Sequence, residues 1–136
     1  MEAHFNLNND EFEQRFSNCT LDDTLFSHEA HLRLAWIHLD KYGLEVAILN
    51  ICDQLLNYVK AVGAEEKFNK TLTCAAVMAV NHFRNKTQAR AFNEFIKEFP
   101  ALKYNFKALI GTHYKIDIYN SIKAKTEFIA PDLEPF

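Results

Sequence analysis

The chain has 136 residues, of which 49% are apolar and 12 are phenylalanine, and its net charge is −3. This length and composition predict one folded domain over residues 1–136 with a phenylalanine-rich core, and they exclude a disordered chain. The 15 basic residues are dispersed and form no block that could follow a phosphate backbone, so we expect no nucleic-acid partner.

The chain lacks the sequence features of a secreted or membrane protein. Its N-terminal residues are polar and acidic, unlike a signal peptide. The longest uncharged, apolar-rich run, residues 71–82, is shorter than the roughly 18–20 residues that cross a membrane. We therefore expect a soluble, cytoplasmic protein that contacts no membrane and whose three cysteines are free thiols.

The spacing of apolar residues predicts an all-α fold, a bundle of five or six helices, and the three glycines and three prolines are too few for a turn-rich β fold. Helices are expected over residues 9–17, 28–42, 44–62, 66–83, 88–99 and 101–110. A short helix is expected within residues 113–124, followed by an irregular tail at 128–136 that packs on the domain. The helix at 66–83 is apolar on nearly every side, which predicts a central position.

The helix over residues 28–42 is the strongest prediction. Ser27 suits its N-cap and Gly43 its C-terminal end. The segment from Ser27 to Gly43 holds three of the six histidines and the only tryptophan. Glu29 and Arg33 lie on the polar face, opposite the apolar stripe.

Three histidines are candidate metal ligands. His28 and His31 are three residues apart, so both can point toward one place, and His82 lies on the inner stripe of the helix at 66–83. Imidazoles from facing helices of a bundle bind zinc or iron. The motifs Glu-x-x-His and His-Glu-x-x-His are absent, and the alternative is that the histidines cap, form hydrogen bonds and fill space.

Residues 26–36 read Phe-Ser-His-Glu-Ala-His-Leu-Arg-Leu-Ala-Trp. They resemble the opening of an uncharacterised bacterial family of small helical proteins that begins Phe-x-His-x-Ala-His-Leu-Arg. Residues 67–73 match that family's stretch Lys/Gly-Tyr-His-Glu-Thr-x-Thr, and residues 128–136 resemble its ending. Asn69 stands where the family has histidine.

The resemblance implies a helical domain of bacterial origin and carries no established activity. Any chemistry would involve the motif positions in its two stretches. Candidate ligand-binding residues are therefore His28, His31, Arg33, Trp36, Asn69, Thr71 and Thr73.

The leading functional hypothesis is a non-enzymatic module that binds a small molecule or a partner protein near His28 and His31. One alternative is a metal-dependent enzyme that uses His28, His31 and His82. Another is an interaction subunit that forms a homodimer through an exposed face containing Ile37, Phe95 or Phe99.

Overall fold

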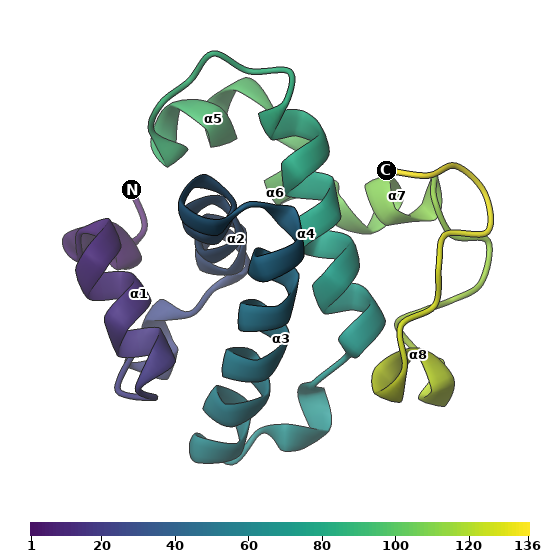
Figure 1. The fold of residues 1–136 in the computed structure, drawn as a ribbon, viewed down its shortest axis with the longest axis horizontal. Helices are drawn as coiled ribbons and strands as arrows, with labels where there is room; N and C mark the ends of the chain where they lie inside the picture. The colour runs from purple at the N-terminus through teal and green to yellow at the C-terminus, as the bar shows by residue number, and fades with distance from the viewer. The chain divides into compact units, whose positions relative to one another are not determined.

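The structure is a computed structural model that describes residues 1–136. It consists of helices joined by turns, without strands, which confirms the predicted all-α class (Figure 1). The chain forms two compact units, residues 1–68 and residues 69–136. None of the helices combines the length and the apolar character that a membrane crossing requires.

The first unit contains three α-helices and three short 3-10 helices. In chain order they are η1 (Ala3–Asn6), α1 (Asn9–Ser17), η2 (Asp23–Leu25), α2 (His28–Tyr42), α3 (Leu44–Ala61) and η3 (Glu65–Lys67). Helix α1 packs against α2 and α3, which also pack against each other. Gly43 is the only residue between α2 and α3, and its φ of 80° is a conformation that glycine adopts without steric penalty.

Helix α1 begins and is buried as its sequence predicts. Asn8 and Glu11 form a capping box, in which each side chain accepts a hydrogen bond from the other residue's backbone N–H. Phe12 and Phe16, four residues apart, are fully buried. The ring of Phe16 lies 5.1 Å from that of Tyr58 on α3, so this aromatic contact joins α1 to α3.

Helix α2 has the predicted ends. The Ser27 hydroxyl accepts a hydrogen bond from the Ala30 amide, and the helix stops at Tyr42. The prediction that Glu29 and Arg33 lie on a solvent-facing side of this helix is wrong, because these residues are only 5% and 4% exposed. Charged side chains are buried only where they find partners, so these two residues point to a specific polar cluster.

The second unit contains five α-helices, most of them short. They are α4 (Lys70–Arg84), α5 (Phe92–Glu98), α6 (Ala101–Tyr104), α7 (Phe106–Gly111) and α8 (Ile122–Thr126). Helix α4 packs against α8, and α6 packs against α7. The predicted central position of residues 66–83 in a single bundle concerns both units and stays a prediction.

Several helices of the second unit differ from their predicted ranges. Two start four residues later than predicted, and one predicted helix is interrupted. Helix α4 begins at Lys70 because the Asn69 side chain caps it by accepting from the Leu72 amide. Helix α5 begins only at Phe92; residues 87–90 are irregular, and the Thr87 hydroxyl accepts there from the Ala89 amide. The predicted helix at 101–110 is split into α6 and α7 at Asn105, whose φ is −132°.

The C-terminal tail packs on the second unit, as predicted. The Tyr114 hydroxyl donates to the Ile129 carbonyl over 2.7 Å. The ring of Phe136 stacks on that of His113 with centroids 3.9 Å apart. The short helix expected within residues 113–124 forms only at the end of that range, where α8 begins at Ile122. Residues 113–121 form turns and irregular backbone.

The predicted dimer face is wrong in two of its three residues. Ile37 is 2% exposed and Phe95 is fully buried. Phe99 is half-buried, and its ring packs near those of Phe83 and Phe95. A homodimer itself stays a prediction.

Candidate functional site

The two histidines of the family-like motif are exposed on the first turn of α2. The ring of His31 stacks on that of Phe26, with centroids 3.8 Å apart and planes 22° from parallel. This contact uses one face of the imidazole and leaves the side chain at the surface. Neither His28 nor His31 belongs to a cluster of three potential metal ligands.

His82, the third predicted metal ligand, lies on α4 in the second unit and is half-buried. The edge of its ring faces Phe83, with ring centroids 5.2 Å apart. Burial lowers the pKa of His82, and the nearby Lys86 and His113 lower it further. A joint site of His82 with His28 and His31 stays a prediction.

The candidate ligand residues of the second unit hold backbone groups in place. The Asn69 side chain donates to the Ile118 carbonyl over 2.8 Å in addition to capping α4. Thr73 donates to the Asn69 carbonyl within the same helical turn. The Thr71 hydroxyl contacts the tail, where it donates to the Glu127 carbonyl over 2.7 Å. These side chains support the fold of the second unit. In the first unit, Trp36 is also buried, 5% exposed.

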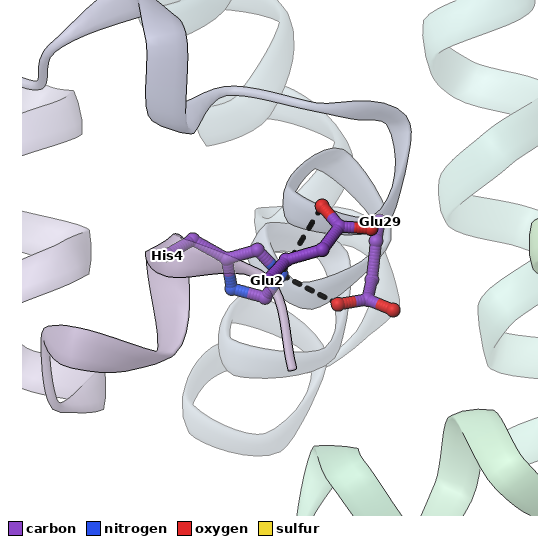
Figure 2. A group of neighbouring side chains, drawn as sticks. All are labelled: Glu2, His4 and Glu29. Carbon is purple, nitrogen blue, oxygen red and sulfur yellow. Dashed lines mark hydrogen bonds and ion pairs between the residues drawn. The ribbon is translucent and has the colours of Figure 1, made fainter.

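A different group of side chains brings metal-ligand atoms together: Glu2, His4 and Glu29 (Figure 2). One oxygen or nitrogen from each residue lies within 4.8 Å of the others. His4 Nε2 is 2.7 Å from Glu29 Oε1 and 4.0 Å from Glu2 Oε1. Figure 2 shows the two carboxylates on either side of this one ring nitrogen. The first unit therefore contains a carboxylate–imidazole–carboxylate arrangement.

Local structure explains how these residues meet. The short helix η1 presents His4, which is 1% exposed, and the first turn of α2 presents Glu29. Glu2 precedes η1 and its carboxylate forms a hydrogen bond with the Ser27 hydroxyl at the N-cap of α2. The Glu2 side chain is 34% exposed, so solvent reaches the cluster from the Glu2 side.

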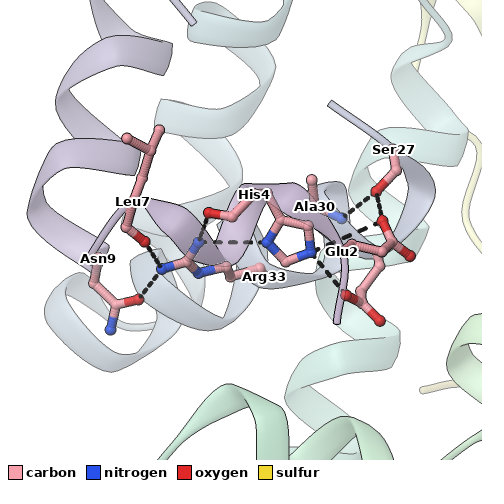
Figure 3. Close-up of polar contacts among 8 residues, drawn as sticks. Glu2, His4, Leu7, Asn9, Ser27, Ala30 and Arg33 are labelled. Carbon is pink, nitrogen blue, oxygen red and sulfur yellow. Dashed lines mark hydrogen bonds and ion pairs between the residues drawn. The ribbon is translucent and has the colours of Figure 1, made fainter. Parts of the chain in front are cut away.

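Arg33 lies one helical turn after Glu29 and fastens the N-terminal segment to α2 (Figure 3). Its guanidinium donates to the His4 carbonyl over 2.7 Å and to the Leu7 carbonyl over 2.8 Å. It also donates to Asn9 Oδ1 over 3.0 Å. We call Glu2, His4, Glu29 and Arg33 the His4 cluster.

Burial controls the charge of the His4 cluster. Desolvation lowers the pKa of His4, and the guanidinium of Arg33 lowers it too, although Glu29 and Glu2 act in the opposite direction. The imidazole is therefore neutral near pH 7, as a metal ligand must be. The His4 cluster contains two carboxylates and one guanidinium, so its formal charge is −1.

A second buried histidine, His38, lies on α2 away from this cluster. It is fully buried, and neither ring nitrogen has a hydrogen-bond partner. Burial lowers its pKa, while Glu13 raises it and Lys41 lowers it. Burial therefore favours the neutral form of the His38 ring in the folded protein.

Sequence reasoning missed Glu2 and His4. The hydrogen bond between His4 and Glu29 joins residues 25 positions apart, so no local spacing reveals it. The helical periodicity also gave a wrong prediction, because it placed the side chains of Glu29 and Arg33 on the solvent-facing side of the helix. The available signal was the pair of opposite charges four residues apart on a helix that is otherwise mostly apolar.

Comparisons of the chain with family models, with curated protein sequences and with solved structures find no match. The resemblance of residues 26–36 to a bacterial family stays a prediction. The functional argument therefore depends on the geometry of the chain itself.

Proposed function

We propose that the protein is a metal-binding module that holds one divalent transition-metal ion with Glu2, His4 and Glu29. The observation that carries this proposal is the convergence of three ligand atoms within 4.8 Å of one another. This proposal keeps the non-enzymatic binding role and moves it from His28 and His31 to the His4 cluster.

The distances in the cluster are close to those of a bound ion. Bonds of about 2.0–2.2 Å to a common ion separate neighbouring ligand atoms by about 3–3.5 Å. The 2.7 Å distance from His4 to Glu29 must lengthen and the 4.0 Å distance to Glu2 must shorten. Both adjustments are below about 1 Å, within the reach of glutamate rotamers.

The ligand set defines the class of ion. One imidazole and two carboxylates, without a thiolate, suit Zn²⁺, Fe²⁺ or Mn²⁺ better than the soft Cu⁺ ion. Three protein ligands leave further coordination positions, which water can reach beside the partly exposed Glu2. The excess negative charge of the cluster adds electrostatic attraction for a cation.

Binding is tested by calorimetric titration of Zn²⁺ and Mn²⁺ into chelator-treated protein that carries no histidine tag. We expect one ion per chain for the wild type. Glu29→Gln keeps the size of the side chain but removes the charge, and we expect it to weaken binding by tenfold or more. The double variant His28→Gln/His31→Gln should bind as the wild type does.

Two results would overturn the proposal. One is the absence of binding in the wild type, which would make the His4 cluster a structural element only. The other is binding that survives Glu29→Gln but is lost in His28→Gln/His31→Gln, which would return the site to the sequence-predicted histidines. Circular dichroism of each variant checks that it is folded.

The other hypotheses gain no support from the structure. These are the small-molecule or partner site at His28 and His31, the metal-dependent enzyme and the homodimeric subunit. A cytoplasmic location is part of the proposal, because it would give the site access to intracellular metal ions.

A further inference from the structure

The position of the hydrogen on the His4 ring follows from the residues around it. Arg33 Nη1 lies 3.4 Å from His4 Nδ1. A guanidinium is always protonated in proteins and has donors only. His4 Nδ1 must therefore present its lone pair to Arg33, because a hydrogen on Nδ1 would face another N–H.

With a lone pair on Nδ1, the ring carries its one hydrogen on Nε2, beside the Glu29 carboxylate. That hydrogen points at Glu29 Oε1, 2.7 Å away (Figure 2). It completes a chain of hydrogen bonds from Arg33, which Figure 3 shows beside His4, through His4 to Glu29. In the metal-free protein, a proton thus occupies the nitrogen that the proposed metal ion needs. Metal-bound histidines instead donate their other ring N–H to a carboxylate, a carbonyl or water.

We propose that Arg33 is a positioning residue that holds His4 in the Nε2–H tautomer, so that a metal ion binds only when this tautomer switches. The metal part of this inference rests on the proposed function, whereas the tautomer part does not. In the switch, the Nε2 hydrogen leaves to solvent as a proton and Nδ1 takes a proton from solvent. The ring stays neutral and the proton count is unchanged.

The switch requires a small movement of Arg33. Each terminal nitrogen of a guanidinium carries two hydrogens, and Nη1 uses one of them for the His4 carbonyl. Only the hydrogen directed at Nδ1 opposes the switch. Arg33 therefore limits metal affinity while it anchors the segment that supplies two of the ligands.

The inference is tested first in the metal-free wild type. Long-range ¹H–¹⁵N correlation spectra of the imidazoles distinguish a protonated ring nitrogen from one with a lone pair. We expect His4 to carry its hydrogen on Nε2, and a spectrum with the hydrogen on Nδ1 would overturn the inference. His4→Gln identifies the His4 signals, because they disappear in that variant.

Addition of zinc to the same wild-type sample tests the switch. We expect the His4 hydrogen to move to Nδ1 as zinc binds. Zinc binding without this movement would refute the switch and leave the metal site intact. Absence of zinc binding would refute the proposed function, while the tautomer of the metal-free protein would still be established.

In the variant Arg33→Gln, we expect His4 to favour the tautomer with its hydrogen on Nδ1. The glutamine amide has an oxygen that can accept a hydrogen bond from Nδ1–H, and the substitution removes a positive charge beside the ion. We expect a larger Nδ1–H population and zinc affinity about tenfold higher. Unchanged affinity in a folded variant would show that Arg33 does not limit binding. The two wild-type measurements decide the inference if this variant fails to fold.

Discussion

The guanidinium of Arg33 lies over the ring of Phe12, with Cζ 4.8 Å from the ring centroid. Phe12 is fully buried and Arg33 is 4% exposed, so this cation–π contact is shielded from water. The same guanidinium binds two backbone carbonyls of the N-terminal segment. Arg33 therefore joins three parts of the first unit: the N-terminal segment, α1 and α2.

Replacement of Arg33 is expected to destabilise the first unit strongly. Arg33→Met keeps much of the apolar volume but leaves the His4 and Leu7 carbonyls and Asn9 Oδ1 without their donor. We expect a loss of about 3–5 kcal/mol in the free energy of unfolding, measured with urea.

Lys41→Met is the matched control for that measurement. Lys41 pairs with Asp10 and Glu13 at the surface, where solvent screens the charges, so its loss should have a much smaller effect. Equal losses for the two variants would contradict the structural role that we assign to Arg33.

Stability is expected to fall in mild acid because of His38. Its pKa is lowered by burial in the folded protein, whereas the unfolded side chain titrates near 6.5. As pH falls below about 6.5, the unfolded chain binds a proton that the folded protein excludes, and unfolding becomes more favourable. His4 contributes in the same direction.

His38→Leu should reduce this pH dependence. The variant also removes two ring nitrogens that have no hydrogen-bond partner, so stability at neutral pH should stay the same or rise. Urea unfolding at several pH values between 5 and 7.5 measures the slope for both proteins. A slope identical to that of the wild type would show that His38 is not a source of the acid sensitivity.

The hydroxyl of Thr71 is expected to hold the C-terminal tail. It donates to the Glu127 carbonyl and accepts from the Ile129 amide over 3.0 Å. Thr71→Val keeps the shape but removes both hydrogen bonds, so we expect about 1–2 kcal/mol of destabilisation and faster hydrogen exchange at the Ile129 amide. Thr73→Val is the control, because Thr73 bonds only within α4. Equal exchange at Ile129 in both variants would refute this role.

Two glycines allow a test of backbone conformation alone. A Cβ added at Gly43 or at Gly111 would meet no atom within 4 Å, so steric contacts do not distinguish them. Gly43 has a φ of 80°, whereas Gly111 ends α7. Gly43→Ala should destabilise the protein by about 1 kcal/mol, and Gly111→Ala should stabilise it slightly, as measured by thermal unfolding. Destabilisation of the same size in both variants would contradict this explanation.

Local signals were sufficient to predict much of the first unit. The ends of α2 depend on Ser27 and Gly43, and the start of α1 depends on Asn8 and Glu11, all of which lie in or next to the helix that they limit. Such interactions can be recognised in sequence because they have fixed spacings. In the second unit, Asn69 caps α4 with that same spacing, so its role could be recognised in the sequence, whereas the break at Asn105 depends on a backbone conformation that periodicity does not register.

The candidate site could not be predicted in the same way. Arg33 reaches the backbone of residues 4 and 7, which any sequence at those positions would supply. Every residue has a backbone carbonyl, so the amino-acid sequence does not indicate which carbonyl accepts a hydrogen bond from Arg33. The pairing of His4 with Glu29 also depends on how η1 folds back onto α2, which is a tertiary property.

The attachment of the N-terminal segment to α2 has a consequence for biosynthesis. Residues 2–9 leave the ribosome before α2, and their partners lie 24–29 positions later in the chain. This segment cannot dock, and Phe5 and Leu7 cannot reach their final environment, until α2 has been synthesised. Its docking therefore depends on the synthesis of α2, and a ribosome that pauses within α2 prolongs the time during which this segment is open to proteases and chaperones.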